Sequence, residues 1–168
     1  MKLIKLTDER CRTFGETLWG PNVTHTVKWS GIFCSRGVIH CYKDLTVALM
    51  LNPIHANFTN PRAWEAEGEV LANDNGLKFG VASLTTIKEI LPLPKITTEQ
   101  RVRFGIFCAL KVYKEPKFIE WANNWLSGVE RSAEAAWAAE QAAERAAWAA
   151  GTAWAQFGLA DIAKRAIS

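Results

Sequence analysis

The chain has 168 residues, of which 49% are hydrophobic and 22% charged, and its net charge is +3. This composition excludes intrinsic disorder, which needs low hydrophobicity and high net charge, and it excludes collagen-like and disulfide-scaffold proteins. The small positive charge is too diffuse to favour nucleic acid as a partner. The length suffices for one hydrophobic core, or for one compact domain with an appended element.

The start of the chain predicts an intracellular protein. Residues 1–6 alternate apolar and charged side chains, as a strand does, and lack the continuous apolar stretch of an export signal. No segment reaches the roughly 18 apolar residues that a membrane span requires, so we expect no membrane partner. The four cysteines lack CxxC spacing. We therefore expect reduced thiols and a cytoplasmic protein.

Short strands separated by turn residues are predicted over the first half of the chain. Gly-Pro, Asn-Pro and Asp-Asn-Gly sequences lie between β-branched or alternating segments. The clearest signal is a hairpin at residues 74–76, because Gly76 can adopt the positive φ of a tight turn. The predicted strands are Leu3–Thr7, Thr24–Trp29, Val38–Cys41, Ala63–Leu71 and Lys78–Leu84, the last two being the partners of the hairpin.

Capping signals predict short helices. Asp44 is a plausible N-cap for a helix over residues 45–51. Thr97 and Gln100 form a capping box that starts a second helix, whose apolar residues then recur on one face. A third helix is predicted over Pro116–Leu126, followed by a serine and a glycine that favour a helix C-terminus.

The C-terminal region has a different composition. Residues 131–166 hold 16 alanines in 36 positions, and alanine has the best helix propensity, so one long helix is predicted over residues 130–157. Leu159–Ile167 could continue it as a short terminal piece. We expect the long helix to pack against the same helix of a second subunit through its large indole side chains, with packing onto its own domain as the alternative. The predicted oligomerisation residues are Trp137, Trp148 and Trp154.

These elements together predict an α+β fold. It consists of a small, mainly antiparallel sheet with two or three packed helices, followed by the long alanine- and tryptophan-rich helix. We expect an α+β domain over residues 1–128 and a helical oligomerisation segment over residues 129–168.

Residues 51–64 are the most site-like segment. Two Asn-Pro dipeptides restrict the chain there, and amide, imidazole, guanidinium and aromatic groups alternate along it. This mixture suits a planar ligand with phosphate or carbonyl groups. The alternative is that the segment only shapes the crossing from a helix to a strand. The predicted ligand-binding residues are His25, His40, Asn52, His55, Asn57, Arg62, Trp64 and Arg101.

The histidines and cysteines predict neither a metal site nor a bound cofactor. Two histidines and two cysteines lie within residues 25–41, but their spacing matches no standard zinc pattern. A cysteine–histidine nucleophile pair is too general a combination to favour catalysis. An enzyme is therefore the less favoured interpretation.

Six blocks of the sequence together form a recognisable pattern: Trp19-Gly20, Thr24-His25-Thr26, residues 34–58, residues 60–70, residues 84–90 and residues 96–101. These blocks resemble a family of phage and prophage proteins, whose members often carry an alanine-rich tail. The resemblance implies a phage origin and an intracellular setting. With the site-like segment, it leads us to expect a non-enzymatic binding protein that sequesters a host small molecule, such as a nucleotide immune signal, as a counter-defence factor. A protein-binding inhibitor or a structural phage protein is an alternative.

A second set of residues occurs in a characteristic order: a strand with His25, the Gly37-Val38-Ile39-His40 strand, a helix over Leu45–Leu51, and Glu67 on a later strand. This order resembles that of the NAD pocket in ADP-ribosyltransferases. The resemblance implies an NAD-using enzyme as the alternative function, with Glu67 and His25 as its catalytic residues.

Overall fold

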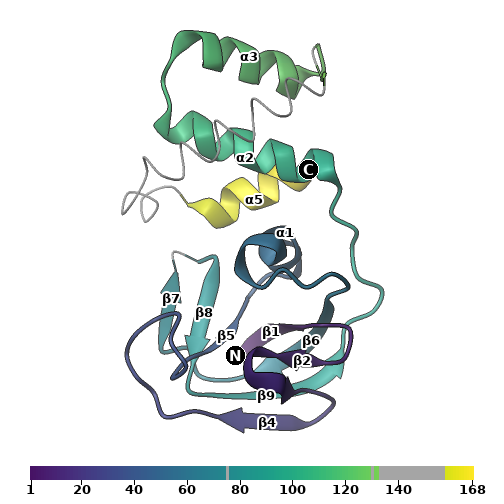
Figure 1. Cartoon of the computed structure of the whole chain (residues 1–168), viewed down its shortest axis with the longest axis vertical. Coiled ribbons are helices and arrows are strands. Elements are labelled where there is room, and N and C mark those ends of the chain that lie inside the picture. Colours follow the sequence, from purple (N-terminus) through teal and green to yellow (C-terminus); the bar gives the residue numbers. More distant parts are fainter. Residues whose placement is uncertain (75, 130, 133–157) are drawn as a thin grey trace. The chain divides into compact units, whose positions relative to one another are not determined.

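The computed structural model describes residues 1–74, 76–129, 131–132 and 158–168 (Figure 1). The chain divides into two compact units, which we call unit 1 (Met1–Lys95) and unit 2 (Ile96–Ser168). Helices and antiparallel strands occur together in the described residues, which confirms the α+β class. The predicted helix over residues 130–157 and its three tryptophans lie outside the described residues.

Unit 1 contains two main sheets, a short ribbon and an α-helix. The sheets have the antiparallel orders β1-β6-β9-β4 and β5-β8-β7, and β2 pairs with β3. A bridge between Ile4 and Tyr42 joins β1 to β5, so the two sheets meet along these strands. The elements are β1 Lys2–Thr7, β2 Arg12–Thr13, the 3-10 turn η1 Phe14–Glu16, β3 Thr17–Leu18, β4 Val23–Thr26, β5 Ile39–Cys41, α1 Leu45–His55, β6 Arg62–Glu67, β7 Ala72–Asp74, β8 Lys78–Val81 and β9 Ser83–Glu89.

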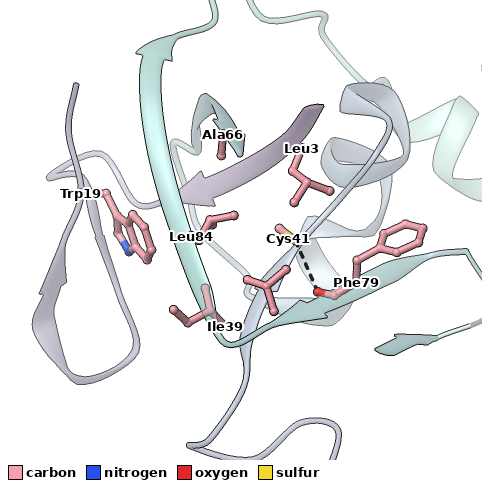
Figure 2. Close-up of a cluster of buried hydrophobic side chains, with 8 residues drawn as sticks. Leu3, Trp19, Ile39, Cys41, Ala66, Phe79 and Leu84 are labelled. Atoms are coloured by element: carbon pink, nitrogen blue, oxygen red, sulfur yellow. Dashed lines mark hydrogen bonds between the residues drawn. The ribbon is translucent and has the colours of Figure 1, made fainter. Parts of the chain in front are cut away.

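Both sheets contribute to the hydrophobic core of unit 1 (Figure 2). Strand residues alternate in direction, so every second side chain of a strand reaches the same side. In the close-up, the side chains of β1, β6 and β9 gather with those of β5 and β8. The core residues are Leu3, Trp19, Ile39, Cys41, Ala66, Phe79, Val81 and Leu84.

The predicted hairpin turn is present, but one of its strands is not the predicted one. The turn joins β7 to β8, with Gly76 at a φ of 79°. β6 ends at Glu67 and pairs with β1 and β9 instead. A Cβ on Gly68 would lie 2.7 Å from the carbonyl oxygen of Ser83, so the chain approaches β9 there too closely for an ordinary strand residue. The prediction of one strand over Ala63–Leu71 is therefore wrong.

The prediction of one strand over Lys78–Leu84 is also wrong. This segment forms β8 and the start of β9, which belong to different sheets and are separated at Ala82. The Ala82 carbonyl accepts a hydrogen bond of 2.8 Å from the backbone N–H of Val27. β9 then continues to Glu89 between β6 and β4. Periodicity alone does not reveal a change of sheet within one apolar run.

The helix of unit 1 begins as predicted. Asp44 Oδ1 accepts hydrogen bonds from the backbone N–H groups of Thr46 and Val47, at 2.9 and 3.0 Å. This confirms the N-cap. The helix continues through Pro53 to His55, one turn beyond the predicted end.

Unit 2 contains α2 Thr98–Val112, α3 Pro116–Ser127 and α5 Leu159–Ile167. The capping box at Thr97 and Gln100 is confirmed. The predicted C-terminus of α3 is also confirmed, because Gly128 is the C-cap and has a φ of 84°. The short terminal helix is present as α5. The core of α2 and α3 consists of Ile106, Ala109, Phe118, Ala122 and Trp125.

α5 packs against α2, which explains why these helices belong to one unit. Gln100 Nε2 donates to the Ile167 carbonyl at 3.2 Å, and the Arg165 guanidinium lies 4.2 Å from the centre of the Phe107 ring. The unit thus starts at α2, before the predicted domain boundary at residue 128. Within the described ranges, the helices lack the combination of length and apolar character needed to cross a membrane.

The core of unit 1 gives a first testable prediction. Leu3→Ala should lower the free energy of unfolding by about 2–5 kcal/mol, because it leaves a cavity at a side chain that is fully buried. The matched control is Leu18→Ala, because Leu18 is 58% exposed and the change there should stay within about 0.5 kcal/mol. Urea unfolding of both variants measures the difference, and equal losses would contradict the described core.

Candidate functional site

Asn52 organises the segment that was predicted to bind a ligand. Its side chain is buried, and it donates from Nδ2 to the Phe58 carbonyl at 2.8 Å and accepts from the Phe58 N–H at 3.2 Å. Its carbonyl accepts from the N–H of Asn57 at 2.6 Å, where the backbone has a φ of 54°. Asn52 therefore closes the loop, and Asn57 lies on the exposed part of it.

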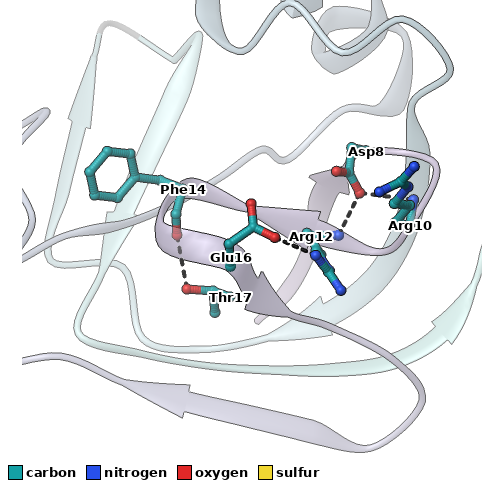
Figure 3. Close-up of polar contacts among 6 residues, drawn as sticks. All are labelled: Asp8, Arg10, Arg12, Phe14, Glu16 and Thr17. Carbon is teal, nitrogen blue, oxygen red and sulfur yellow. Dashed lines mark hydrogen bonds and ion pairs between the residues drawn. The ribbon is translucent and has the colours of Figure 1, made fainter.

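This loop forms one wall of a groove of about 320 Å³ in unit 1, which we call the turn–loop groove. The other wall is the turn that follows β1, part of which Figure 3 shows. Asn60 Nδ2 donates to Glu9 Oε2 at 3.1 Å and connects the two walls. Small-molecule sites begin at about 300 Å³. The lining residues are Asp8, Glu9, Arg10, Arg12, Glu16, Asn57, Phe58, Thr59 and Asn60.

The charged groups of the turn–loop groove are not equally available. Asp8 Oδ1 accepts from the backbone N–H groups of Arg10 and Arg12, at 2.9 and 2.7 Å (Figure 3). Arg12 also pairs with Glu16 at the surface, and such exposed pairs contribute about 0–1 kcal/mol. The guanidinium of Arg10 has no ion-pair partner among the described residues. The lining also contains the carboxylates of Asp8, Glu9 and Glu16, so an incoming anion would bind at Arg10 and would compete with Glu16 for Arg12.

Arg62 and Trp64 were predicted to bind a ligand, but the structure uses their polar groups within unit 1. Arg62 donates from Nε and Nη2 to the carboxylate of Glu89, at 2.7 and 2.5 Å. The hydrogen bond from Arg62 holds the pKa of Glu89 below its ordinary value. Trp64 is buried, and its Nε1 donates to Thr7 Oγ1 at 3.2 Å.

His25 and Glu67, the alternative catalytic pair, point to opposite faces of their sheet. Glu67 lies opposite Thr85, and Thr85 lies opposite Thr24. The hydroxyl oxygens of Thr24 and Thr85 are 2.8 Å apart, which confirms that they share a face. His25 is the next residue and therefore faces the other side. Its Nε2 donates to the carbonyl of Leu18 at 2.8 Å.

The structure brings His40 and His55 together with two lysines, Lys5 and Lys78, and we call these four residues the lysine–histidine cluster. Burial lowers the pKa of His40 to about 4, and Lys78, Lys5 and His55 add to this effect. Burial, followed by Lys78, lowers the pKa of His55 to about 4. Its Nδ1 is 3.1 Å from the Tyr42 hydroxyl. Both imidazoles are therefore neutral at pH 7.

Both lysines of the cluster are nine-tenths buried, with exposures of 8% for Lys5 and 9% for Lys78. Lys5 Nζ donates to the His40 carbonyl at 2.8 Å, and burial lowers the pKa of Lys5 to about 8. Lys78 Nζ donates to Cys34 Sγ at 3.2 Å. In the part of the chain that the structure describes, no carboxylate lies within ion-pair distance of either ammonium.

Sequence analysis missed both lysines. Lysine in a strand is ordinarily exposed, and Lys78 and Cys34 are 44 positions apart. A signal for Lys5 was present, because residues 3, 4 and 6 place apolar side chains on both faces of β1. Such a strand leaves no polar face for the lysine.

Arg101 is the remaining residue of the predicted ligand set, and it belongs to unit 2. It is exposed in the first turn of α2, and its Nη1 donates to the Ile96 carbonyl at 3.2 Å. The interaction that the structure assigns to its side chain is therefore local.

Comparison of the chain with protein-family models, with curated proteins and with solved structures finds no match. The geometry of the described residues is therefore the basis for a functional proposal.

The neutral histidines predict a pH dependence of stability. The pKa of His55 is about 4 in the folded chain and about 6.5 ordinarily, so between these values the unfolded chain binds more protons and stability falls as the pH is lowered. His55→Phe removes this contribution. The unfolding free energy of the wild type minus that of the variant should therefore decrease from pH 6.5 to pH 4, as measured by urea unfolding.

The matched control for this measurement is Leu18→Ala, which changes an exposed side chain that does not titrate. Its difference from the wild type should stay constant over the same pH range. A difference for His55→Phe that also stays constant would contradict the special environment of His55.

Proposed function

We propose that this chain is a non-enzymatic phage protein that sequesters a small anionic molecule of the nucleotide class in the turn–loop groove. The observation that carries the proposal is the guanidinium of Arg10, in a lining that holds three carboxylates and two arginines. The Asp8 carboxylate is already bonded to backbone N–H groups, whereas the Arg10 guanidinium is unpaired among the described residues. In the setting that the resemblance implies, the host cytoplasm, such binding would withdraw an immune signal.

The chemistry of the groove fits a phosphate and a base. Arg10 and Arg12 offer planar guanidinium forks, which bind phosphate oxygens in pairs. On the opposite wall, Phe58 offers an aromatic ring, and Asn57 an amide that donates and accepts hydrogen bonds. Bases stack on aromatic side chains and are distinguished by such hydrogen bonds.

One observation supports binding over the alternative transferase function. The residues of the alternative transferase function, His25 and Glu67, face opposite sides of a sheet. No observation favours that second function.

We also propose that the chain forms a homo-oligomer through residues 130–157. The proposal rests on the sequence: the segment is rich in alanine, and Trp137, Trp148 and Trp154 are its large apolar side chains. A symmetric assembly would repeat the turn–loop groove once in each copy.

Nucleotide binding is tested by measuring the melting temperature of the full chain with a panel of linear nucleotides, cyclic nucleotides and ADP-ribose. At least one compound should raise it, because a ligand that binds the folded state stabilises that state. Arg10→Gln should weaken the binding of that compound by roughly 10- to 100-fold, because a charge-assisted hydrogen bond contributes about 1.5–3 kcal/mol.

The matched control for Arg10→Gln is Arg36→Gln. Arg36 is exposed in unit 1 and does not line the groove, so affinity should change less than about twofold. The proposal fails if no compound raises the melting temperature, or if both variants weaken binding equally.

Native mass spectrometry tests the oligomer. We expect an assembly larger than 18.7 kDa at micromolar concentration, and a shift toward single chains when Trp137 and Trp148 are both changed to alanine. A single-chain mass for the wild type would contradict the proposal.

A further inference from the structure

We propose that Cys34 is a reactive thiol, activated by Lys78, and that it is a site of oxidation by hydrogen peroxide. Cys34 is exposed and lies in the loop between β4 and β5. Its sulfur accepts a hydrogen bond from Lys78 Nζ at 3.2 Å. This site has no residue in common with the turn–loop groove, so it goes beyond the proposed function.

The Lys78 ammonium is directed at the sulfur by the fold. Lys78 lies on β8, the central strand of its sheet, and its side chain is nine-tenths buried. An ammonium carries three donors and no acceptor, so it must donate to the sulfur. Its only hydrogen bond among the described residues is this one. A donated charge-assisted hydrogen bond stabilises a thiolate, which is the nucleophilic form of cysteine.

Phe33, the residue before Cys34, packs the loop against β8. The Phe33 ring packs edge-on against His40, with centroids 5.1 Å apart, and a Cβ on Gly80 would lie 3.0 Å from this ring. Gly80 is two residues from Lys78 on β8 and therefore on the same face. Phe33 thus covers Gly80 and places Cys34 at Lys78.

His40 fixes the backbone of the reactive residue. The Cys34 N–H donates to His40 Nε2 at 3.3 Å, so this nitrogen is an acceptor and the imidazole is neutral. Cys34 has a φ of 62°, a conformation that costs free energy for a side-chain-bearing residue and persists only where the surroundings enforce it. The hydrogen bond to His40 and the contact of Phe33 supply this constraint.

The other three cysteines lack this combination of exposure and cationic donor. Cys41 and Cys108 are buried, and burial raises the pKa of each thiol to about 12. Cys11 is partly exposed, and in the described residues the Arg62 guanidinium interacts with it electrostatically without donating a hydrogen bond to its sulfur. Cys34 should therefore react first.

The oxidation step balances with hydrogen peroxide as the oxidant. The thiolate of Cys34 attacks one peroxide oxygen, so that an S–O bond forms and the O–O bond breaks. The sulfur loses two electrons, the peroxide gains them, and the leaving hydroxide takes a proton from the ammonium of Lys78 or from water. The product is a sulfenic acid, which thiol reductants return to the thiol.

Alkylation by iodoacetamide at pH 7, followed by peptide mass spectrometry, tests the reactivity in the folded wild type. Cys34 should be labelled at least about tenfold faster than each of the other cysteines. After treatment with hydrogen peroxide, dimedone should label Cys34. Equal rates for Cys34 and Cys11, or no dimedone label on Cys34, would overturn the proposal, and neither measurement needs a variant.

Variants test the role of Lys78. Lys78→Met should slow the alkylation of Cys34 about tenfold at pH 7, whereas Lys78→Arg keeps the cation and should restore the rate. The matched control is Lys43→Met, because Lys43 contacts the Phe79 ring and not Cys34. An unchanged rate in a folded Lys78→Met chain would overturn the activation by Lys78.

Discussion

The arrangement of unit 1 depends on the contact between β1 and β5. The backbones of Ile4 and Tyr42 exchange two hydrogen bonds of 2.8 Å there, and the buried Lys5 ammonium donates to the His40 carbonyl. A buried cation is costly unless its donors are used. β5 is therefore held where its carbonyl can accept this bond. Because β5 carries His40 and follows the loop of Cys34, this contact also positions the lysine–histidine cluster and the thiol.

The proposed ligand-binding groove and the proposed reactive thiol lie in different parts of unit 1. The turn–loop groove combines exposed guanidinium and amide groups and depends on Asn52, whose side chain closes the loop. The thiol depends on β8, where the ammonium of Lys78 is buried and oriented. The buried ammonium of Lys78 lies over the Phe33 ring as well as donating to Cys34, whereas the exposed guanidinium of Arg10 has no ion-pair partner among the described residues.

Local signals in the sequence predicted where helices and turns begin and end better than they predicted which strands pair with each other. The caps at Asp44, Thr97 and Gly128 and the turn at Gly76 follow from chemistry within a few residues, and all are confirmed. The pairing of the strands depends on distant contacts, such as the approach of Gly68 to β9, that no local pattern encodes.

The residues of the candidate site were also hard to predict from local sequence patterns. Polar side chains that suit a ligand also suit the chain's own backbone and carboxylates. This explains why Asn52 and Arg62 have internal partners. Asn57 lines the groove as part of the predicted loop. The contact of Lys78 with Cys34 could not be predicted, because it joins residues from separate parts of the chain.

The change of sheet at Ala82 has a consequence for how unit 1 comes apart. β8 and β9 are successive segments of one backbone, yet each is an inner strand of a different sheet, and the Ala82 carbonyl between them is bonded to Val27. Separation of β8 from its sheet would displace β9 in the other sheet, and the reverse also holds. Opening one sheet alone would therefore cost nearly as much free energy as opening both, so the two sheets should unfold as one cooperative unit.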